Sequence, residues 1–361
     1  MRKKDKERLI EQEISFSFTL QWHLTNKCTK HCKHRYLYDA KGNPFEITQE
    51  LSFNEQLKII EDLANFARKQ KVPARINFTG GDPLLHLDLF NLIKYAQEFG
   101  IMIGILGNPD LLTKENLNTL TKLHLQYYQI NLDGLEKNHD FIRGEGDFKK
   151  TVQGLDKLKE AKIPSAVMFT LTKLNRKDLF SIINLVVKKE VSFFDFRRIV
   201  PTNFNPSLMK MMLAPAEFKT ILQKVFLKYK EMKQKGMKTC FERGDPLWFL
   251  FYKENRLLDI SWVRDKNIIY SGCAIGISEL GVLPDGSVYA CRRLPIFIGK
   301  FPEQTIEEVF INSQELNKMR DVSKIEKCTE CELNQFCRGC RAIAYATTGS
   351  VYAPDPQCWK E

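Results

Sequence analysis

The sequence predicts an α/β fold, in which a partial (β/α)6 TIM-type barrel is followed by a small cysteine-rich α+β domain. Short β-type runs alternate with amphipathic helical patterns over the first 200 residues, as in a parallel sheet with helical crossovers. Hydrophobic residues make up 43% of the 361 residues, enough for one large domain and a smaller one. Seven of the ten cysteines lie between Cys273 and Cys358. We therefore expect a barrel over residues 1–200, a linker and bridging helix over 201–250, and a cysteine-rich domain over 251–361.

The first barrel strand is predicted by strict alternation of apolar and polar residues over residues 14–22. A helix follows, because Ser52 and Glu55 form a capping-box pattern ahead of an apolar face. Six strand-and-helix units give three quarters of a closed barrel, and sites belong at the C-terminal ends of its strands. The other strands are expected near 74–78, 101–106, 126–132, 166–172 and 192–199, and the helices between them near 88–99, 114–124, 148–161 and 177–188.

The alternation ends at residues 201–215, a stretch with several prolines and asparagines that we interpret as a linker. A lysine-rich amphipathic helix is predicted over 218–235. Further along, Asp285 and Gly286 stand between two apolar β-type pairs, which predicts a β-hairpin.

The net charge of +11 comes mostly from lysines scattered over predicted helix faces. A solvated surface is the favoured interpretation, and attraction to an acidic partner such as a peptide leader is the alternative. No nucleic-acid partner is expected, because no basic run is interleaved with aromatic residues. No stretch is long and apolar enough to span a membrane, and the charged segment 1–12 lacks the core of a signal peptide, so we expect a cytoplasmic protein without a membrane partner.

A pair of cysteines, Cys28 and Cys32, follows the first predicted strand, and Arg35 comes three residues later. This run resembles the C-x3-C-x2-C loop of the radical S-adenosylmethionine (radical SAM) enzymes, with Arg35 in place of the third cysteine. The resemblance implies a [4Fe–4S] cluster that is held by Cys28 and Cys32 and binds S-adenosylmethionine. In that family, reductive cleavage of the cofactor yields a 5′-deoxyadenosyl radical that abstracts hydrogen from the substrate.

Other predicted loops resemble the cofactor-binding loops of the same family. Gly80-Gly81-Asp82-Pro83 stands in the place of its G-G-E-P loop, where the backbone binds the cofactor's ammonium group. Arg143, in a run like the family's D-x-I-R-G, is implied to bind the cofactor carboxylate, and a surface ion pair with Glu145 or Asp147 is the alternative. The remaining cofactor-binding residues implied by the resemblance are His34, which would stack on adenine, and Asn108, Asn131 and Asp133. Catalytic residues are not assigned.

The later cysteines resemble the SPASM extension of radical SAM enzymes, which holds auxiliary iron–sulfur clusters. The two pairs Cys328/Cys331 and Cys337/Cys340 each have C-x2-C spacing. Structural zinc is the alternative, because such pairs also build tetrahedral zinc sites. Seven thiolates are one short of two [4Fe–4S] clusters, and Cys240 stands apart. The resemblance implies that Cys328, Cys331, Cys337 and Cys358 hold the outer cluster and that Cys273, Cys291 and Cys340 hold the inner one.

Arg35 is the main departure from the family pattern, because a guanidinium is always cationic and has no lone pair to offer iron. It is a single-site change in an otherwise active lineage, a mark of a degenerate peptide-binding member, or a contact in a reshaped pocket. We favour the first, since the other cofactor features are retained.

The leading functional hypothesis is a maturase of ribosomally made peptides or proteins. The alternatives are a radical SAM enzyme of tetrapyrrole or metallocofactor assembly, and a non-catalytic scaffold that carries auxiliary clusters. The expected partners are a peptide or small-protein substrate, a separate leader-binding protein, and an electron donor such as flavodoxin or ferredoxin.

Overall fold

The computed structural model describes residues 17–30, 32–33, 49–263 and 268–360. Its centre is one ten-stranded sheet with the order β10-β9-β8-β1-β2-β3-β4-β5-β6-β7, and neighbouring strands from β1 to β7 are parallel. These seven strands are β1 (Phe18–Thr25), β2 (Ala74–Gly80), β3 (Met102–Leu106), β4 (Tyr127–Asn131), β5 (Ser165–Leu171), β6 (Phe193–Arg198) and β7 (Cys240–Phe241). The predicted α/β class and parallel sheet are confirmed.

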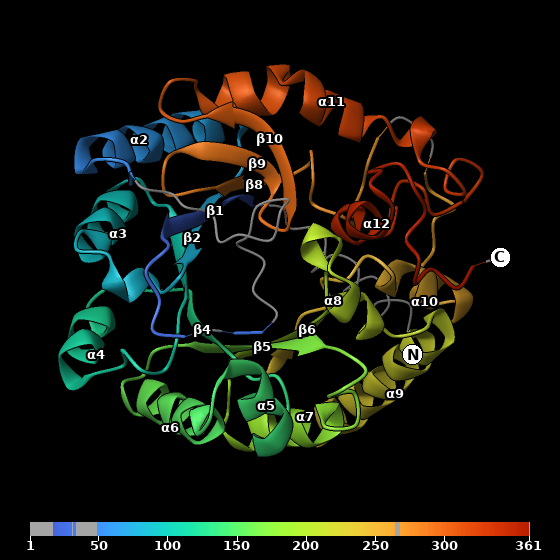
Figure 1. Ribbon diagram of the computed structural model, residues 1–361, viewed down its shortest axis with the longest axis horizontal. Coiled ribbons are helices and arrows are strands. Elements are labelled where there is room, and N and C mark those ends of the chain that lie inside the picture. The colour runs from blue at the N-terminus through green and yellow to red at the C-terminus, as the bar shows by residue number, and fades with distance from the viewer. Residues whose placement is uncertain (1–16, 31, 34–48, 264–267, 361) are drawn as a thin grey trace.

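Helices cover the outside of the curved sheet (Figure 1). The helices after β1 to β5 are α2 (Phe53–Gln70), α3 (Leu89–Glu98), α4 (Lys114–Thr121), α5 (Glu136–Arg143), α6 (Asp147–Glu160) and α7 (Leu179–Lys188). Ser52 caps α2, and its side chain and that of Glu55 complete the predicted capping box. The predicted helices lie within three residues of the observed ones at each end, whereas the short helix α5 was not predicted from the sequence.

The two faces of the barrel sheet differ in chemistry. On β1, Leu20, Trp22 and Leu24 are almost fully buried in the hydrophobic core. Side chains alternate along a strand, so Gln21 and His23 point to the inside of the barrel. The outer face therefore supplies the packing energy that holds the helices, and the inner face carries polar groups.

The first strand is displaced from its prediction. Residues 14–22 were expected, and β1 spans Phe18–Thr25, while residues 14–16 lie outside the described ranges. The alternation continues through Leu24 on the same face. The sequence pattern therefore predicted correctly which residues share a face of the strand, but not where the strand begins and ends.

The cysteine-rich part joins the same sheet. Strand β8 (Glu279–Val282) runs parallel to β1, and β9 (Ser287–Cys291) and β10 (Leu294–Lys300) follow antiparallel. The predicted hairpin is thus present between β8 and β9. Gly286 has φ +83°, and a Cβ there would lie 2.0 Å from the Phe301 carbonyl oxygen, so the turn requires glycine. The predicted division of the chain at residues 200 and 250 stays a prediction.

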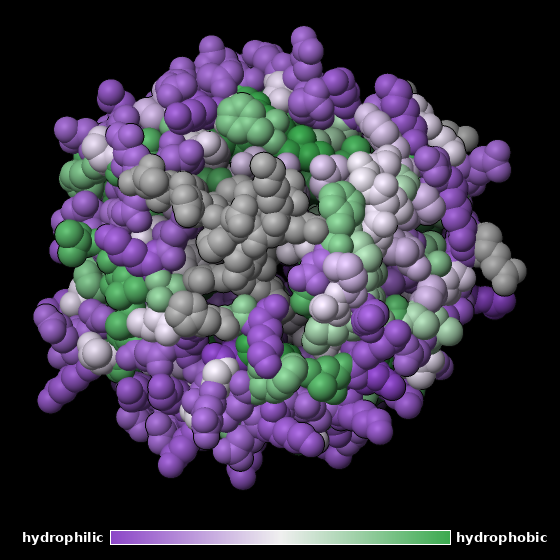
Figure 2. All heavy atoms as spheres, viewed as in Figure 1, coloured by the Kyte–Doolittle hydropathy of each residue, from purple (hydrophilic) through white to green (hydrophobic). Residues whose placement is uncertain are grey.

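Residues 201–215 hold a short helix, α8 (Pro206–Lys210), and the predicted lysine-rich helix is α9 (Pro215–Gln234). The remaining helices are α10 (Trp248–Glu254), α11 (Gln314–Arg320) and α12 (Arg341–Thr348). Among the described helices, none has the length and apolar character needed to traverse a bilayer. Hydrophilic side chains surround the rim of the molecule in Figure 2, in keeping with the predicted solvated surface.

Arg198, at the end of β6, ties the barrel to the C-terminal segment. Its side chain is 1% exposed and bonds both Asp245, at 2.7 and 3.0 Å, and Asp355, at 2.8 and 2.9 Å. Burial alone would lower the pKa of Arg198, but the two carboxylates outweigh it and raise the pKa. Asp355 also accepts the backbone N–H of Cys340 at 2.8 Å. One buried guanidinium thus joins β6, the loop before α10 and a segment that positions two predicted cluster ligands, Cys340 and Cys358.

Replacing Arg198 with methionine tests this connection. The change leaves two buried carboxylates without their cation, so we expect the free energy of unfolding to fall by about 3–5 kcal/mol. Urea denaturation followed by circular dichroism at equal iron loading measures it. The matched control is Lys159→Met, because Lys159 pairs with Glu190 where both side chains are about half exposed, and that change should cost less than about 1 kcal/mol. Equal small losses in the two variants would contradict the role given to Arg198.

Candidate active site

The front cysteine loop begins where β1 ends, at the C-terminal rim of the barrel. Two backbone bonds fix it to the loop after β2: the Gly81 N–H donates to the Thr25 carbonyl at 2.7 Å, and the Asp82 N–H donates to that of Lys27 at 2.8 Å. A Cβ at Gly81 would lie 2.0 Å from the Lys27 carbonyl oxygen, so only glycine permits this approach. Gly80-Gly81 therefore shapes the cysteine loop. His34 and Arg35 lie outside the described residues.

Asp82 links the loops after β2 and β3. Its fully buried carboxylate accepts the backbone N–H groups of Leu84 at 3.0 Å and Asn108 at 3.2 Å. Burial raises the pKa of Asp82 to about 6. The Asn108 side-chain amide in turn donates to the Cys28 sulfur at 3.5 Å. Pro83, which follows, is buried at the first position of a short 3-10 helix, Pro83–Leu85.

Arg143, at the end of α5, points to the second front cysteine. Its Nε donates to Asp133 Oδ2 at 2.5 Å, and Nη1 lies 3.7 Å from the Cys32 sulfur. Arg143 is only 9% exposed and forms a buried ion pair with Asp133, so the surface ion pair that the sequence left open is wrong. Asp133 also accepts the Thr170 N–H at 2.7 Å. An arginine held this way can present a fixed guanidinium edge beside the cysteine loop.

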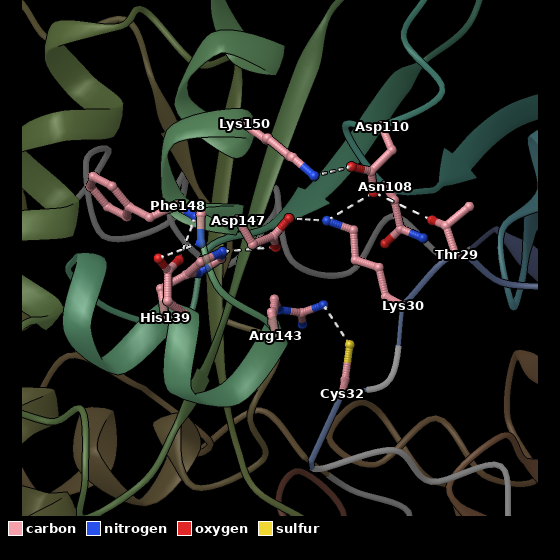
Figure 3. A network of polar contacts seen from close by, with 12 residues as sticks. Thr29, Lys30, Cys32, Asn108, Asp110, His139, Arg143, Asp147, Phe148 and Lys150 are labelled. Carbon is pink, nitrogen blue, oxygen red and sulfur yellow. Dashed lines mark hydrogen bonds and ion pairs between the residues drawn. The ribbon is translucent and has the colours of Figure 1, made fainter.

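Lys30, between the two front cysteines, anchors their loop (Figure 3). Its ammonium is buried and pairs with Asp110 at 3.0 Å and with Asp147. Asp147 Oδ2 lies 3.0 Å from His139 Nε2, and His139 Nδ1 accepts the Asp133 N–H at 3.0 Å. These bonds assign the neutral tautomer with its proton on Nε2. The network joins the cysteine loop to the loops after β3 and β4, to α5 and to the first residue of α6.

A cavity of about 190 Å³ lies next to this network. Ile142, the residue before Arg143, forms one wall, and its carbonyl accepts the Lys33 N–H at 3.0 Å. The Lys33 ammonium lies 3.4 Å from the centre of the Phe141 ring. Most of the exposed lining is apolar, as in sites for small organic molecules. The lining residues are Lys33, Phe141, Ile142, Thr170, Thr172, Ser207, Leu208 and Met211. Asn131, the other predicted cofactor residue, is half-buried at the end of β4.

The seven later cysteines form two neighbourhoods. The first neighbourhood contains Cys273, Cys291 and Cys340. Burial is the main cause that raises the pKa of Cys291 to about 12, and a nearby charge on Cys273 raises it further. Burial also raises the pKa of Cys340, and Cys273 again adds to the rise. In the second neighbourhood, the charge of Cys358 reinforces burial in raising the pKa of Cys328 and Cys337, and Cys331 acts on both Cys328 and Cys358. Each neighbourhood contains the cysteines that the resemblance assigns to one auxiliary cluster.

Cys240 lies on β7, and the charges near its thiol are Glu242, Lys233 and Arg243.

Among the residues that the structure describes, no three Cys, His, Asp or Glu side chains are placed to hold one metal ion. The outer set of four thiols suits a [4Fe–4S] cluster, and the inner set of three leaves one iron for another ligand. The front loop offers two thiols and Arg35, and this donor set does not fit a cluster that needs three thiolates.

Two protein-family models match parts of this chain. Residues 22–186 match the Radical SAM superfamily, and residues 273–341 match SPASM, an iron-sulfur cluster-binding domain. The chain therefore belongs to the radical SAM enzymes that carry a C-terminal SPASM domain. These domains imply [4Fe–4S] clusters and S-adenosylmethionine as its cofactors, as expected from the sequence.

Several relatives match nearly the whole chain. It is 28% identical to the AdoMet-dependent heme synthase of Methanosarcina barkeri, over 94% of this chain and 95% of that protein. It is 27% identical to the Fe-coproporphyrin III synthase of the same organism, over 99% and 92%. The PqqA peptide cyclase of Bradyrhizobium diazoefficiens is 23% identical, over 98% and 89%. The fold is similar to that of Streptococcus suis SuiB bound to S-adenosylmethionine, with TM-score 0.75 and 16% identity over 99% of this chain and 81% of that one.

Sequence reasoning missed the anchoring residues Lys30, Asp110 and Asp147. Lysine and aspartate are common on surfaces, and nothing in their local pattern distinguishes a buried ion pair. The position of Lys30 between two cysteines was the available signal. His139 has a structural role, because its two ring nitrogens bond the Asp133 backbone and the Asp147 carboxylate.

A pH profile tests the His139 assignment. Burial lowers the pKa of His139 from 6.5 to about 4, so the unfolded chain binds a proton first as the pH falls. Its contribution to stability is present above pH 6.5 and is lost as the pH falls toward 4, by at most about 1.4 kcal/mol per pH unit. Urea denaturation should show a flatter profile in this range for His139→Gln. Exposed His124→Gln is the control. Parallel profiles for wild type and His139→Gln would contradict a buried neutral histidine.

Proposed function

We propose that the site of this chain is built to act on a tetrapyrrole by radical SAM chemistry, and that the reaction needs a third thiolate at position 35, where the chain has arginine. The observation that carries the proposal is the near-complete alignment with the two Methanosarcina barkeri synthases, at higher identity than the peptide cyclase. The proposal reverses our order of preference from the sequence, where peptide maturation came first.

The front site supports the cofactor half of the proposal. Arg143, held by Asp133, is directed at Cys32 and is suited to pair with the carboxylate of S-adenosylmethionine. The cavity beside Lys33 and Phe141 suits part of the same cofactor, such as its nucleoside. Lys30, through Asp110 and Asp147, holds the cysteine loop in place. Gly80, Gly81, Asp82, Asn108 and Asn131 complete the rim that we assign to cofactor binding.

Arg35 limits what the front site does in this chain. Two thiolates and a guanidinium do not supply the three ligands that the family's cluster requires, and the arginine adds positive charge to a sequence run that already carries Lys30 and Lys33. In the family, the cofactor bound to that cluster supplies the radical. The residues that bind and orient the cofactor are retained here, so restoring one thiol should restore the chemistry.

The test is a comparison of the chain as it stands with Arg35→Cys under anaerobic conditions, with S-adenosylmethionine, a strong reductant and iron coproporphyrin III. We expect 5′-deoxyadenosine and decarboxylated porphyrin from Arg35→Cys and neither above background from the original chain. Liquid chromatography with mass spectrometry measures both products. Arg35→Ser is the matched control, because it removes the charge without adding a thiolate. It should form neither 5′-deoxyadenosine nor decarboxylated porphyrin above background.

Two results would contradict the proposal. Cleavage of the cofactor by Arg35→Cys without any change in porphyrin would overturn the tetrapyrrole assignment. A reconstituted Arg35→Cys protein that does not cleave the cofactor would overturn the enzymatic assignment itself.

Peptide maturation is the second candidate. It is supported by the similarity to the PqqA peptide cyclase, by the fold shared with SuiB, whose structure has also been solved with its precursor peptide SuiA, and by the net charge of +11, which suits an acidic peptide. Under this candidate a peptide or small protein is the substrate and a separate leader-binding protein assists. Either candidate requires an electron donor such as flavodoxin or ferredoxin. A peptide mass change with Arg35→Cys, and none for porphyrin, would favour this candidate.

A further inference from the structure

The inside of the barrel is polar. Strand register places Gln21 of β1 opposite Asn77 of β2, and Met168 of β5 opposite Asp195 of β6. Closed barrels of this kind fill the same face with branched apolar side chains that pack into a core. Here the apolar residues lie on the outer face, against the helices. The inner face is therefore suited to contact a polar or charged molecule.

Four arginines belong to this inner region. Arg75 lies on β2, Arg197 on β6, and Arg292 and Arg293 in the turn between β9 and β10. They act on common neighbours: burial raises the pKa of Tyr127, and the positive charges of Arg75 and Arg292 both oppose that rise. Arg293 and Arg197 lie close enough for the charge of one to affect the other. The arginines thus gather around one part of the inner face.

Three acids lie in the same region, and Arg75 has a buried atom that none of the described residues pairs with. Asp195 pairs with Arg197 at 2.5 Å, and Glu279 accepts a hydrogen bond from Gln21 at 3.1 Å. Glu242 is the third acid, and burial raises its pKa. The Arg75 Nε is buried and has no hydrogen-bond partner among the described residues. A buried guanidinium nitrogen without a partner is costly, and a bound carboxylate would satisfy it.

The arginines lie toward the inner auxiliary neighbourhood. Arg75 and Glu279 both lie opposite Thr19, at the start of β1, and the charge of Glu279 acts on Cys291. The charge of Arg293 acts on both Cys291 and Cys340. The front cysteines follow the other end of β1, about 20 Å away at the rise of a β-strand. A molecule that binds the arginines and extends along the inner face lies between the two cysteine sites.

We infer that Arg75, Arg292 and Arg293 form a carboxylate-binding site on the inner face of the barrel, which anchors the acidic side chains of a tetrapyrrole substrate. The inference rests on the proposed function and adds the residues that recognise the substrate. Guanidinium groups bind carboxylates through two parallel hydrogen bonds, which fixes orientation as well as position. Anchoring some carboxylates at this end leaves another part of the macrocycle directed to the front site.

The test is equilibrium binding of coproporphyrin III to the full chain with its auxiliary clusters reconstituted, followed by the porphyrin absorbance. Arg75→Met should weaken binding about ten- to a hundredfold, the range for a lost hydrogen bond between charged groups. Arg75→Lys keeps the positive charge but cannot form two parallel hydrogen bonds, so its affinity for coproporphyrin III should lie between those of wild type and Arg75→Met. Arg68→Met is the control, because Arg68 is exposed on α2, and it should bind like wild type. The tetramethyl ester of coproporphyrin III should bind weakly to all of them.

The outcomes separate the two proposals. If wild type does not bind coproporphyrin III, the tetrapyrrole function fails and the inference fails with it. If wild type binds, but Arg75→Met and Arg292→Met bind as tightly as Arg68→Met, the inference alone fails. Equal binding of the acid and its ester would likewise overturn a carboxylate site. Thermal unfolding of each variant confirms that the folded proteins are being compared.

Discussion

The pairing of β8 with β1 is the constraint on which the arrangement of both cysteine sites depends. Cys28 and Cys32 follow the C-terminal end of β1, and β8 lies parallel to the same strand with Val282 opposite Trp22. The hairpin then returns along β8 and ends at Cys291. Backbone hydrogen bonds therefore fix the front loop relative to the inner auxiliary neighbourhood, and the polar inner face lies between them.

Side-chain ion pairs complete this arrangement. Arg198 joins the far side of the barrel to Asp355, which holds the backbone of Cys340. Lys30 does the same for the front loop through Asp110 and Asp147. In both cases one buried cation satisfies two carboxylates, which is favourable only with close hydrogen-bonded geometry. The chain thus fixes its cysteine-bearing segments through charge pairs as well as through core packing.

Local pattern was sufficient to predict most of the fold. Alternation and helical periodicity located the barrel strands and their helices, because burial on one face leaves a periodic signal. The pairing of β8 with β1 left no such signal, since its partners are about 260 residues apart. The same holds at the site: the cysteine and Gly80-Gly81 motifs were visible, whereas the partner of Arg143 depended on how α5 packs beside Asp133. The inner arginines were missed because their common neighbours come from four separate segments.

The central claim is that the thiolates of this chain hold iron. Iron and acid-labile sulfide, counted in anaerobically reconstituted protein, test it most directly. Two auxiliary clusters predict about eight iron and eight sulfide ions per chain as it stands, and a front cluster restored by a third thiolate predicts about twelve of each. Protein that contains zinc, or that retains neither iron nor sulfide after reconstitution, would contradict the account.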